Sequence, residues 1–169
     1  MSLANKITLA RGVLIVPIVA VLFAGRREIA LGLFLIASAG DVLDGMMARS
    51  RHEVSALGKV LDPAVDKVLY ASLVVSLWTM GVIPTLWLIL FFLPQLGLGI
   101  GAIILHYMAR KVQGSRVLGK ASSVLTFLSM SLLIIGVGAG LPVFYAAVCA
   151  TYAAALDYLI GALRLVHKE

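Results

Sequence analysis

Four aspartates between residues 41 and 66 are the side chains best suited to chemistry in this sequence. They make up half of the eight acidic residues and are Asp41, Asp44, Asp62 and Asp66. A carboxylate at the centre of a membrane helix costs about 2.5–3.5 kcal/mol, so four of them in apolar surroundings need a cation. A ligand set with oxygen alone, without His or Cys, suits a hard divalent cation such as Mg²⁺ or Mn²⁺. Four carboxylates exceed what one such ion usually takes, which predicts two ions that clamp the attacking and leaving oxygens of a phosphoryl displacement.

The first two aspartates share one face of a predicted helix with small and basic residues. At helical spacing, an arc of about 140° holds five positions: Asp41, Asp44, Gly45, Ala48 and Arg49. Gly45 and Ala48 lack bulk, so a planar base or a phosphate can approach the backbone. The planar guanidinium of Arg49 can pair with phosphate oxygens.

The other two aspartates define a second face. Gly58, Asp62 and Asp66 recur every four residues, and this face meets the first across a short loop. Two alternatives remain open. The small residues could form a helix contact while the aspartates pair with nearby basic side chains, or the acids could mark a divalent-cation or proton transporter. The acids gather at one end of two helices, which favours an enzyme site.

The composition indicates an integral membrane protein. Hydrophobic residues make up 62% of the 169 and charged residues 13%, compared with roughly 45–50% apolar residues in soluble domains. The net charge of +6 is spread between apolar segments and forms no continuous stripe, which argues against nucleic-acid binding. The single cysteine, Cys149, excludes a disulfide framework.

Six apolar runs are each near the roughly 20 residues that a membrane-spanning helix needs. They cover residues 7–24, 29–47, 60–79, 82–108, 121–137 and 143–163. The predicted fold is therefore an all-α membrane protein with six transmembrane helices in a single domain over residues 1–169.

The basic residues predict the orientation. With a cytoplasmic amino terminus, twelve Lys and Arg residues face the cytoplasm and only Arg26 and Arg27 lie outside, as the positive-inside rule requires. Both termini and the aspartate cluster are then cytoplasmic. The expected location is a bacterial inner (plasma) membrane, spanned several times, with the active site facing the cytoplasm.

Two motifs resemble those of one enzyme family. Residues 41–49, DVLDGMMAR, are followed after eight residues by GKVLDPAVD at 58–66. Together they resemble the signature DxxDGxxAR(x8)GxxxDxxxD of the CDP-alcohol phosphatidyltransferases. NKITLAR at residues 5–11 resembles the NxxTxxR of the phosphatidylglycerophosphate synthase and cardiolipin synthase branches. The resemblance implies a homodimer that transfers a phosphatidyl group from CDP-diacylglycerol to an alcohol and releases CMP.

The resemblance also implies a role for each matching residue. The four aspartates would hold two divalent cations, and Asp66 would in addition be the base that activates the acceptor hydroxyl. Gly45 and Ala48 would accept the cytidine. The complete CDP-lipid site would consist of Asn5, Thr8, Asp41, Gly45, Ala48, Arg49 and Gly58.

The acceptor is expected to be a small phosphorylated alcohol, glycerol 3-phosphate. Arg110, Arg116 and Lys120 form a basic group between the fourth and fifth predicted helices, and a phosphate needs several such donors; membrane anchoring is the other explanation. GKASS at 119–123 resembles the GKxxT of phosphatidylglycerophosphate synthases, whereas Leu93, Pro94 and Gln95 replace their Arg-Glu or Arg-Asp pair. Phosphatidylglycerol, giving cardiolipin, and an inositol phosphate are the alternative acceptors.

Overall fold

Six α-helices and no strand make up the residues that the computed structural model describes. These residues are 3–50, 56–107 and 116–166, and side chains are described for 8–40, 63–95, 97 and 117–161. The helices are α1 (Leu3–Phe23), α2 (Arg27–Ser50), α3 (Ala56–Thr79), α4 (Thr85–Tyr107), α5 (Arg116–Ile135) and α6 (Gly140–Val166). The prediction of six helices is confirmed over the described part of the chain.

Several helices extend beyond the apolar runs that predicted them. α2 continues to Ser50, α3 begins at Ala56 and α5 begins at Arg116. An apolar run marks the residues that suit an apolar environment, whereas helical backbone hydrogen bonds continue through polar residues as well. Arg116 and Lys120, expected between helices, therefore lie within the first turns of α5.

Glycines in the left-handed conformation end the odd-numbered helices. Gly25, Gly81 and Gly136 have φ of 74°, 75° and 82°. After α5, Gly136 N donates to Leu133 O at 3.1 Å and Val137 N donates to Leu132 O at 2.9 Å. The turns after α1 and α3 repeat both hydrogen bonds, which is the Schellman pattern of helix termination. Each of these helices is thus joined to the next through a short turn that backbone hydrogen bonds stabilise.

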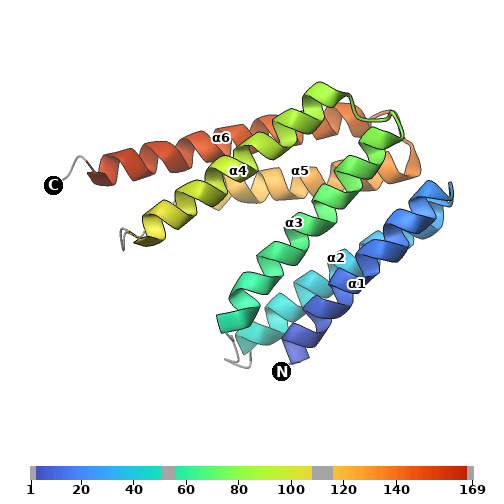
Figure 1. Ribbon diagram of the computed structural model, residues 1–169, viewed down its shortest axis with the longest axis horizontal. Coiled ribbons are helices and arrows are strands. Elements are labelled where there is room, and N and C mark those ends of the chain that lie inside the picture. Colours follow the sequence, from blue (N-terminus) through green and yellow to red (C-terminus); the bar gives the residue numbers. More distant parts are fainter. Residues whose placement is uncertain (1–2, 51–55, 108–115, 167–169) are drawn as a thin grey trace. The chain divides into compact units, whose positions relative to one another are not determined.

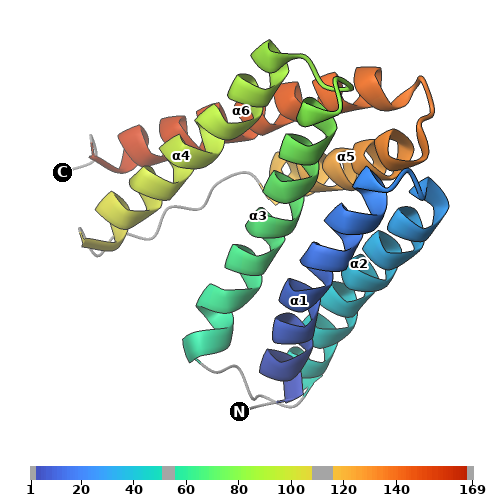
Figure 2. The same cartoon turned by 45° about the vertical axis from the view of Figure 1, so that its right-hand side comes forward.

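The chain forms two compact units. The first comprises Met1–Val82 with Met130–Val137, and in it α1 packs against both α2 and α3. Figures 1 and 2 show the amino-terminal end of α1 beside the carboxyl end of α2. The second comprises Ile83–Ser129 with Gly138–Glu169, where α4 packs against α6 and Trp87 stacks on Tyr145 at 3.9 Å between ring centroids.

A single buried stripe on α1, which we call the α1 seam, organises the first unit. Its members are spaced alternately three and four residues apart and are Thr8, Arg11, Ile15, Ile18 and Leu22. The buried apolar residues of the two neighbouring helices follow similar spacings and include Ala30, Phe34 and Ala37 on α2 and Leu69, Leu73 and Leu77 on α3. Because this spacing keeps residues on one helix face, the α1 seam is apolar along most of its length and polar near its amino-terminal end.

The outer faces of the helices are also apolar. Val13 and Val16 on α1 are each 72% exposed, an arrangement that suits contact with lipid. Among the described residues, Val117–Ile135 and Gly140–Gly161 are long and apolar enough to cross a membrane, whereas the apolar helical stretches Thr8–Phe23 and Thr85–Gln95 are shorter. The complete set of six spans, the location of the termini and the single domain remain predictions.

Replacement of Gly136 by alanine is expected to destabilise the protein. A left-handed conformation costs a residue with a Cβ about 1–2 kcal/mol, and the new Cβ would also collide with the guanidinium of Arg27. We expect a lower melting temperature of the purified protein in detergent. Gly138→Ala is the matched control, because no atom lies within 4 Å of a Cβ there and its φ is not positive. Equal melting temperatures for the two variants would contradict this account.

Candidate functional site

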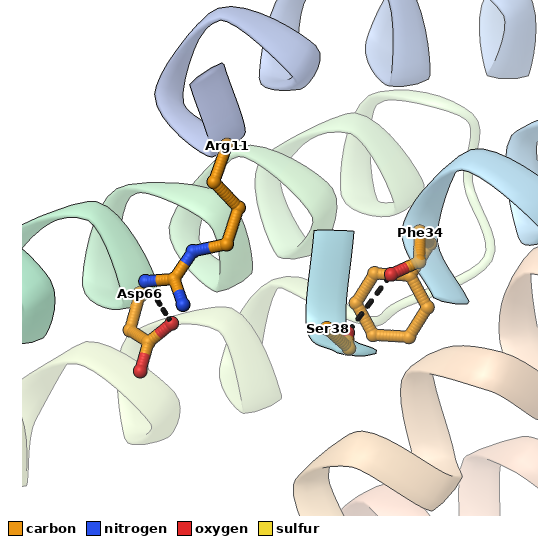
Figure 3. Close-up of polar contacts among 4 residues, drawn as sticks. All are labelled: Arg11, Phe34, Ser38 and Asp66. Carbon is orange, nitrogen blue, oxygen red and sulfur yellow. Dashed lines mark hydrogen bonds and ion pairs between the residues drawn. The ribbon is translucent and has the colours of Figure 1, made fainter. Parts of the chain in front are cut away.

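An ion pair between Arg11 and Asp66 links α1 to α3 at the polar end of the α1 seam. Nη2 of Arg11 lies 3.0 Å from Oδ1 of Asp66. The Arg11 side chain is 1% exposed and that of Asp66 is 38% exposed, so the cation is buried and the carboxylate reaches the surface of the first unit. Figure 3 shows the arginine extending from α1 toward Asp66, whose second oxygen points away from the guanidinium.

The buried guanidinium needs this partner. Arginine stays protonated in proteins, and its transfer out of water is costly unless an anion compensates it. Asp66 provides that anion while one of its oxygens stays directed away from the pair. The arrangement therefore places a partly exposed carboxylate against a buried cation.

A close approach of the two helices adjoins the ion pair. A Cβ built at Gly12 would lie 3.8 Å from Cγ2 of Val65, in ordinary van der Waals contact. Gly12 follows Arg11 and Val65 precedes Asp66 in the sequence. The backbone of α1 therefore lies so close to α3 that only about one methyl group would fit between them. This close approach limits the conformational freedom of Arg11 and Asp66.

An aromatic contact lies about one helical turn from Asp66 along α3. The rings of Phe34 on α2 and Tyr70 on α3 meet edge to face, with 6.1 Å between their centroids, and Tyr70 lies one helical turn beyond Asp66. The hydroxyl of Ser38 donates to the Phe34 carbonyl at 2.9 Å (Figure 3). The ring contact connects α2 to α3, whereas the hydrogen bond lies within α2.

Thr8 and Lys120 are the other predicted site residues whose side chains are described. Thr8 is fully buried one turn before Arg11 on the same seam. Lys120 is exposed on α5 and belongs to the second unit. In α4, Leu93 is exposed and Pro94 is buried.

The remaining predicted residues can be located along the helices but their side chains lie outside the described part. Asn5 is in α1, and Arg116 is the first residue of α5. α2 carries Asp41, Asp44, Gly45, Ala48 and Arg49, and α3 carries Gly58 and Asp62. Arg110 lies outside the described residues. Among described side chains no group of three His, Cys, Asp or Glu residues gathers; the side chains of Asp41, Asp44 and Asp62 lie outside them.

Arg11 was not predicted as a site residue. It belongs to the NKITLAR motif and to the basic residues that predict the orientation, and neither gave it a role in chemistry. Arg11 lies three residues after Thr8 and four before Ile15, a spacing that becomes informative only once the buried face of α1 is known. A permanent cation in register with apolar seam residues predicts a buried anionic partner.

Comparison with known proteins adds independent findings. A family model described as CDP-alcohol phosphatidyltransferase matches residues 1–160. A probable phosphatidylglycerophosphate synthase of Mycobacterium tuberculosis is 28% identical over 174 residues, covering 96% of this chain and 82% of the relative. A CDP-diacylglycerol–glycerol-3-phosphate 3-phosphatidyltransferase of Rickettsia typhi is 36% identical over 80 residues, 45% of this chain and 44% of the relative. A CMP-forming cardiolipin synthase of Homo sapiens is 48% identical over 58 residues, 34% of this chain and 19% of the relative.

The ion pair predicts energetic coupling between its two residues. In Asp66→Asn the buried guanidinium loses this counter-charge, and in Arg11→Gln the carboxylate loses its cation, so each single variant should be less stable. The double variant should lose less stability than the sum of the two single losses, with a coupling energy of about 0.5–3 kcal/mol. Unfolding of the purified protein in detergent measures the free energy of unfolding of the two single variants and of the double variant.

A second cycle provides the control. Arg26 is an exposed cation in the turn after α1, and its replacement by glutamine should be additive with Asp66→Asn within about 0.5 kcal/mol. Additivity in the Arg11 cycle as well would contradict the ion pair.

Proposed function

The chain belongs to the CDP-alcohol phosphatidyltransferase family, and we propose that it transfers the phosphatidyl group of CDP-diacylglycerol to glycerol 3-phosphate. The products would be phosphatidylglycerophosphate and CMP. Family membership makes the chain a phospholipid-synthesising transferase of a membrane-associated family; the substrates are the proposal. The observation that carries it is the position of Asp66, which is the last carboxylate of the family signature and is paired with a buried arginine.

The reaction needs a base and a leaving group. The acceptor hydroxyl attacks the phosphorus that carries diacylglycerol, and the bond from that phosphorus to the CMP oxygen breaks. The hydroxyl proton passes to the oxygen of Asp66 that points away from Arg11. A base must come within about 2.6–3.2 Å of the hydroxyl it deprotonates, and the 38% exposure of the Asp66 side chain leaves room for that approach.

The family uses divalent cations, and we propose Mg²⁺ or Mn²⁺ held by Asp41, Asp44, Asp62 and Asp66. When bound, a pair of such ions would neutralise charge on the diphosphate and on the CMP leaving group. The donor chemistry fits, because all four proposed ligands are carboxylates.

The helix register supports convergence of these ligands. The spacing of the buried residues Ala30, Phe34 and Ala37 on α2 continues in sequence through Asp41, Asp44 and Ala48. On α3, the spacing of Leu73 and Leu69 continues back to Asp66 and Asp62. Since α2 and α3 are helical through all of these positions, the aspartates continue the sequence register of those buried residues.

The CDP-lipid would lie beside the same helix ends. Gly45, Ala48 and Arg49 on α2 and Gly58 on α3 are the proposed contacts for cytidine and phosphates. Asn5 and Thr8 on α1 would close the site around the diphosphate, and the burial of Thr8 on the α1 seam beside the aspartate end supports this assignment.

The acceptor phosphate is assigned to Arg110, Arg116 and Lys120. Arg116 begins α5 and Lys120 follows four residues later, a spacing that brings side chains onto one helix face. Phosphatidylglycerol is the second candidate acceptor, supported by the match to the human cardiolipin synthase and by Leu93, Pro94 and Gln95 in place of the charged pair.

The proposed setting is a bilayer crossed six times, with both termini and the active site at the cytoplasmic face. The exposed valines of α1 and the two long apolar segments support it. Assembly as a homodimer remains a prediction.

CMP release tests the function directly. The purified protein is given CDP-diacylglycerol, Mg²⁺ or Mn²⁺, and glycerol 3-phosphate, phosphatidylglycerol or an inositol phosphate in separate reactions. We expect CMP with glycerol 3-phosphate and none after chelation of the metal. Asp66→Asn should lower the rate by about 10²–10⁴-fold, the usual contribution of a general base, while CDP-diacylglycerol binding largely persists.

Other outcomes separate the alternatives. CMP release with phosphatidylglycerol alone would identify a cardiolipin synthase. No CMP with any acceptor, together with metal flux in liposomes, would instead identify a transporter. Full activity of Asp66→Asn would remove Asp66 as the base.

The basic residues of α5 provide a separate prediction. Arg116→Ala and Lys120→Ala should each raise the KM for glycerol 3-phosphate by roughly tenfold or more, because a charge-assisted hydrogen bond contributes about 1.5–3 kcal/mol. The KM for CDP-diacylglycerol should change much less. Arg26→Ala, which removes an exposed cation elsewhere, is the control for net charge. Equal increases for both substrates would contradict an acceptor site here.

A further inference from the structure

We propose that the ring contact between Phe34 and Tyr70 holds α2 and α3 at the separation that Mg²⁺ requires, and that it thereby makes the metal site selective for Mg²⁺ over Ca²⁺. The inference rests on the proposed function, because it assumes that aspartates of both helices bind divalent cations. Phe34 and Tyr70 are positioning residues in this account, since they act through the aspartates. Neither residue belongs to the family signature at residues 41–66.

The contact joins two rigid side chains. The ring centroids of Phe34 and Tyr70 are 6.1 Å apart and the ring planes meet at 77°, within the range that aromatic pairs favour. Phe34 is fully buried on α2 and Tyr70 is half-buried on α3. Because neither ring can shorten or extend, the pair opposes both a closer and a wider approach of the two helices.

The pair restricts a motion that packing on α1 leaves possible. α2 and α3 each pack against α1, and two helices on a common third can change the angle between them while they keep those contacts. A direct contact between α2 and α3 removes this freedom, as the third side of a triangle does. Close-packed interiors have low compressibility and transmit such a constraint.

The ring contact lies close to the aspartates along both helices. Tyr70 follows Asp66 by four residues, which is about 6 Å along α3, and Phe34 precedes Asp41 by seven, which is about 10 Å along α2. Both spacings return to nearly the same helix face, and both helices are continuous through these positions. A change in separation at the rings is therefore expected to move the aspartates of one helix relative to those of the other.

Cations differ in how much such a movement costs them. Mg²⁺ needs near-ideal octahedral geometry at about 2.0–2.1 Å, whereas Ca²⁺ accepts six to eight oxygens at about 2.3–2.6 Å in flexible geometry. A looser separation of the ligand-bearing helices should therefore weaken Mg²⁺ binding more than Ca²⁺ binding. A general loss of stability would weaken the binding of both cations alike, so the ratio of the two affinities isolates the positioning role.

Metal binding to two Tyr70 variants tests the inference. Binding is measured from the protection that Mg²⁺ or Ca²⁺ alone gives the purified protein against thermal unfolding in detergent. Tyr70→Leu keeps an apolar side chain but removes the ring, and it should weaken Mg²⁺ binding by roughly tenfold, as loss of outer-shell support typically does. Its Ca²⁺ binding should change less than about threefold, because the geometry of that ion is flexible.

Tyr70→Phe is the matched control on the same residue. It keeps the ring and should keep the Mg²⁺ to Ca²⁺ affinity ratio of the wild type. A ratio that falls as far in Tyr70→Phe as in Tyr70→Leu would assign the effect to the hydroxyl and would overturn the inference. An equal loss of both cations in Tyr70→Leu would also overturn it.

Leu77→Ala is the control for stability. Leu77 is 1% exposed on α3 and lies about three turns beyond Asp66, so its truncation weakens the core far from the aspartates. If Leu77→Ala lowers the affinity ratio as much as Tyr70→Leu, the ring contact is ordinary packing and the inference is wrong.

The wild type separates this inference from the proposed function. A wild type that binds Mg²⁺ and releases CMP, with an affinity ratio that Tyr70→Leu leaves unchanged, refutes the inference alone. A wild type that neither cation protects refutes the proposed metal site and the inference with it.

Discussion

The desolvated charge of Arg11 constrains how α1 and α3 can pack. A buried guanidinium must face an anion, and Asp66 meets it only if α3 keeps its rotation about its own axis. A change of one residue in register would turn Asp66 by about 100° and would remove Leu69 and Leu73 from the core at the same time. The ion pair and the apolar packing therefore specify the same arrangement of the two helices.

The first unit divides into an apolar and a polar part along the α1 seam. Ile15, Ile18 and Leu22 pack with apolar residues of α2 and α3 and supply rigidity. Thr8 and Arg11 extend the same seam toward the helix ends that carry the aspartates. A polar end supported by a rigidly packed apolar part suits phosphoryl chemistry, since preorganised groups need not rearrange during the reaction.

The six helices and the family could be predicted from the sequence, because apolar run length and an extended motif are local signals. Arg11 was missed for a physical reason. The outer face of α1, with Val13 and Val16 exposed, is as apolar as its buried face, so periodicity could not reveal which face packs. The early start of α5 at Arg116 was missed because hydropathy reports the apolar environment and not the extent of backbone hydrogen bonding.

The distance along the chain between Arg11 and Asp66 has a consequence for folding. The glycine-capped turn after α1 closes through hydrogen bonds between residues at most five apart, and such local contacts form at little entropic cost. Arg11 and Asp66 are separated by 55 positions, so their pairing must wait until α2 has folded back and α3 has followed it. Asp66 is thus expected to meet Arg11 late in folding, after the local turns have formed.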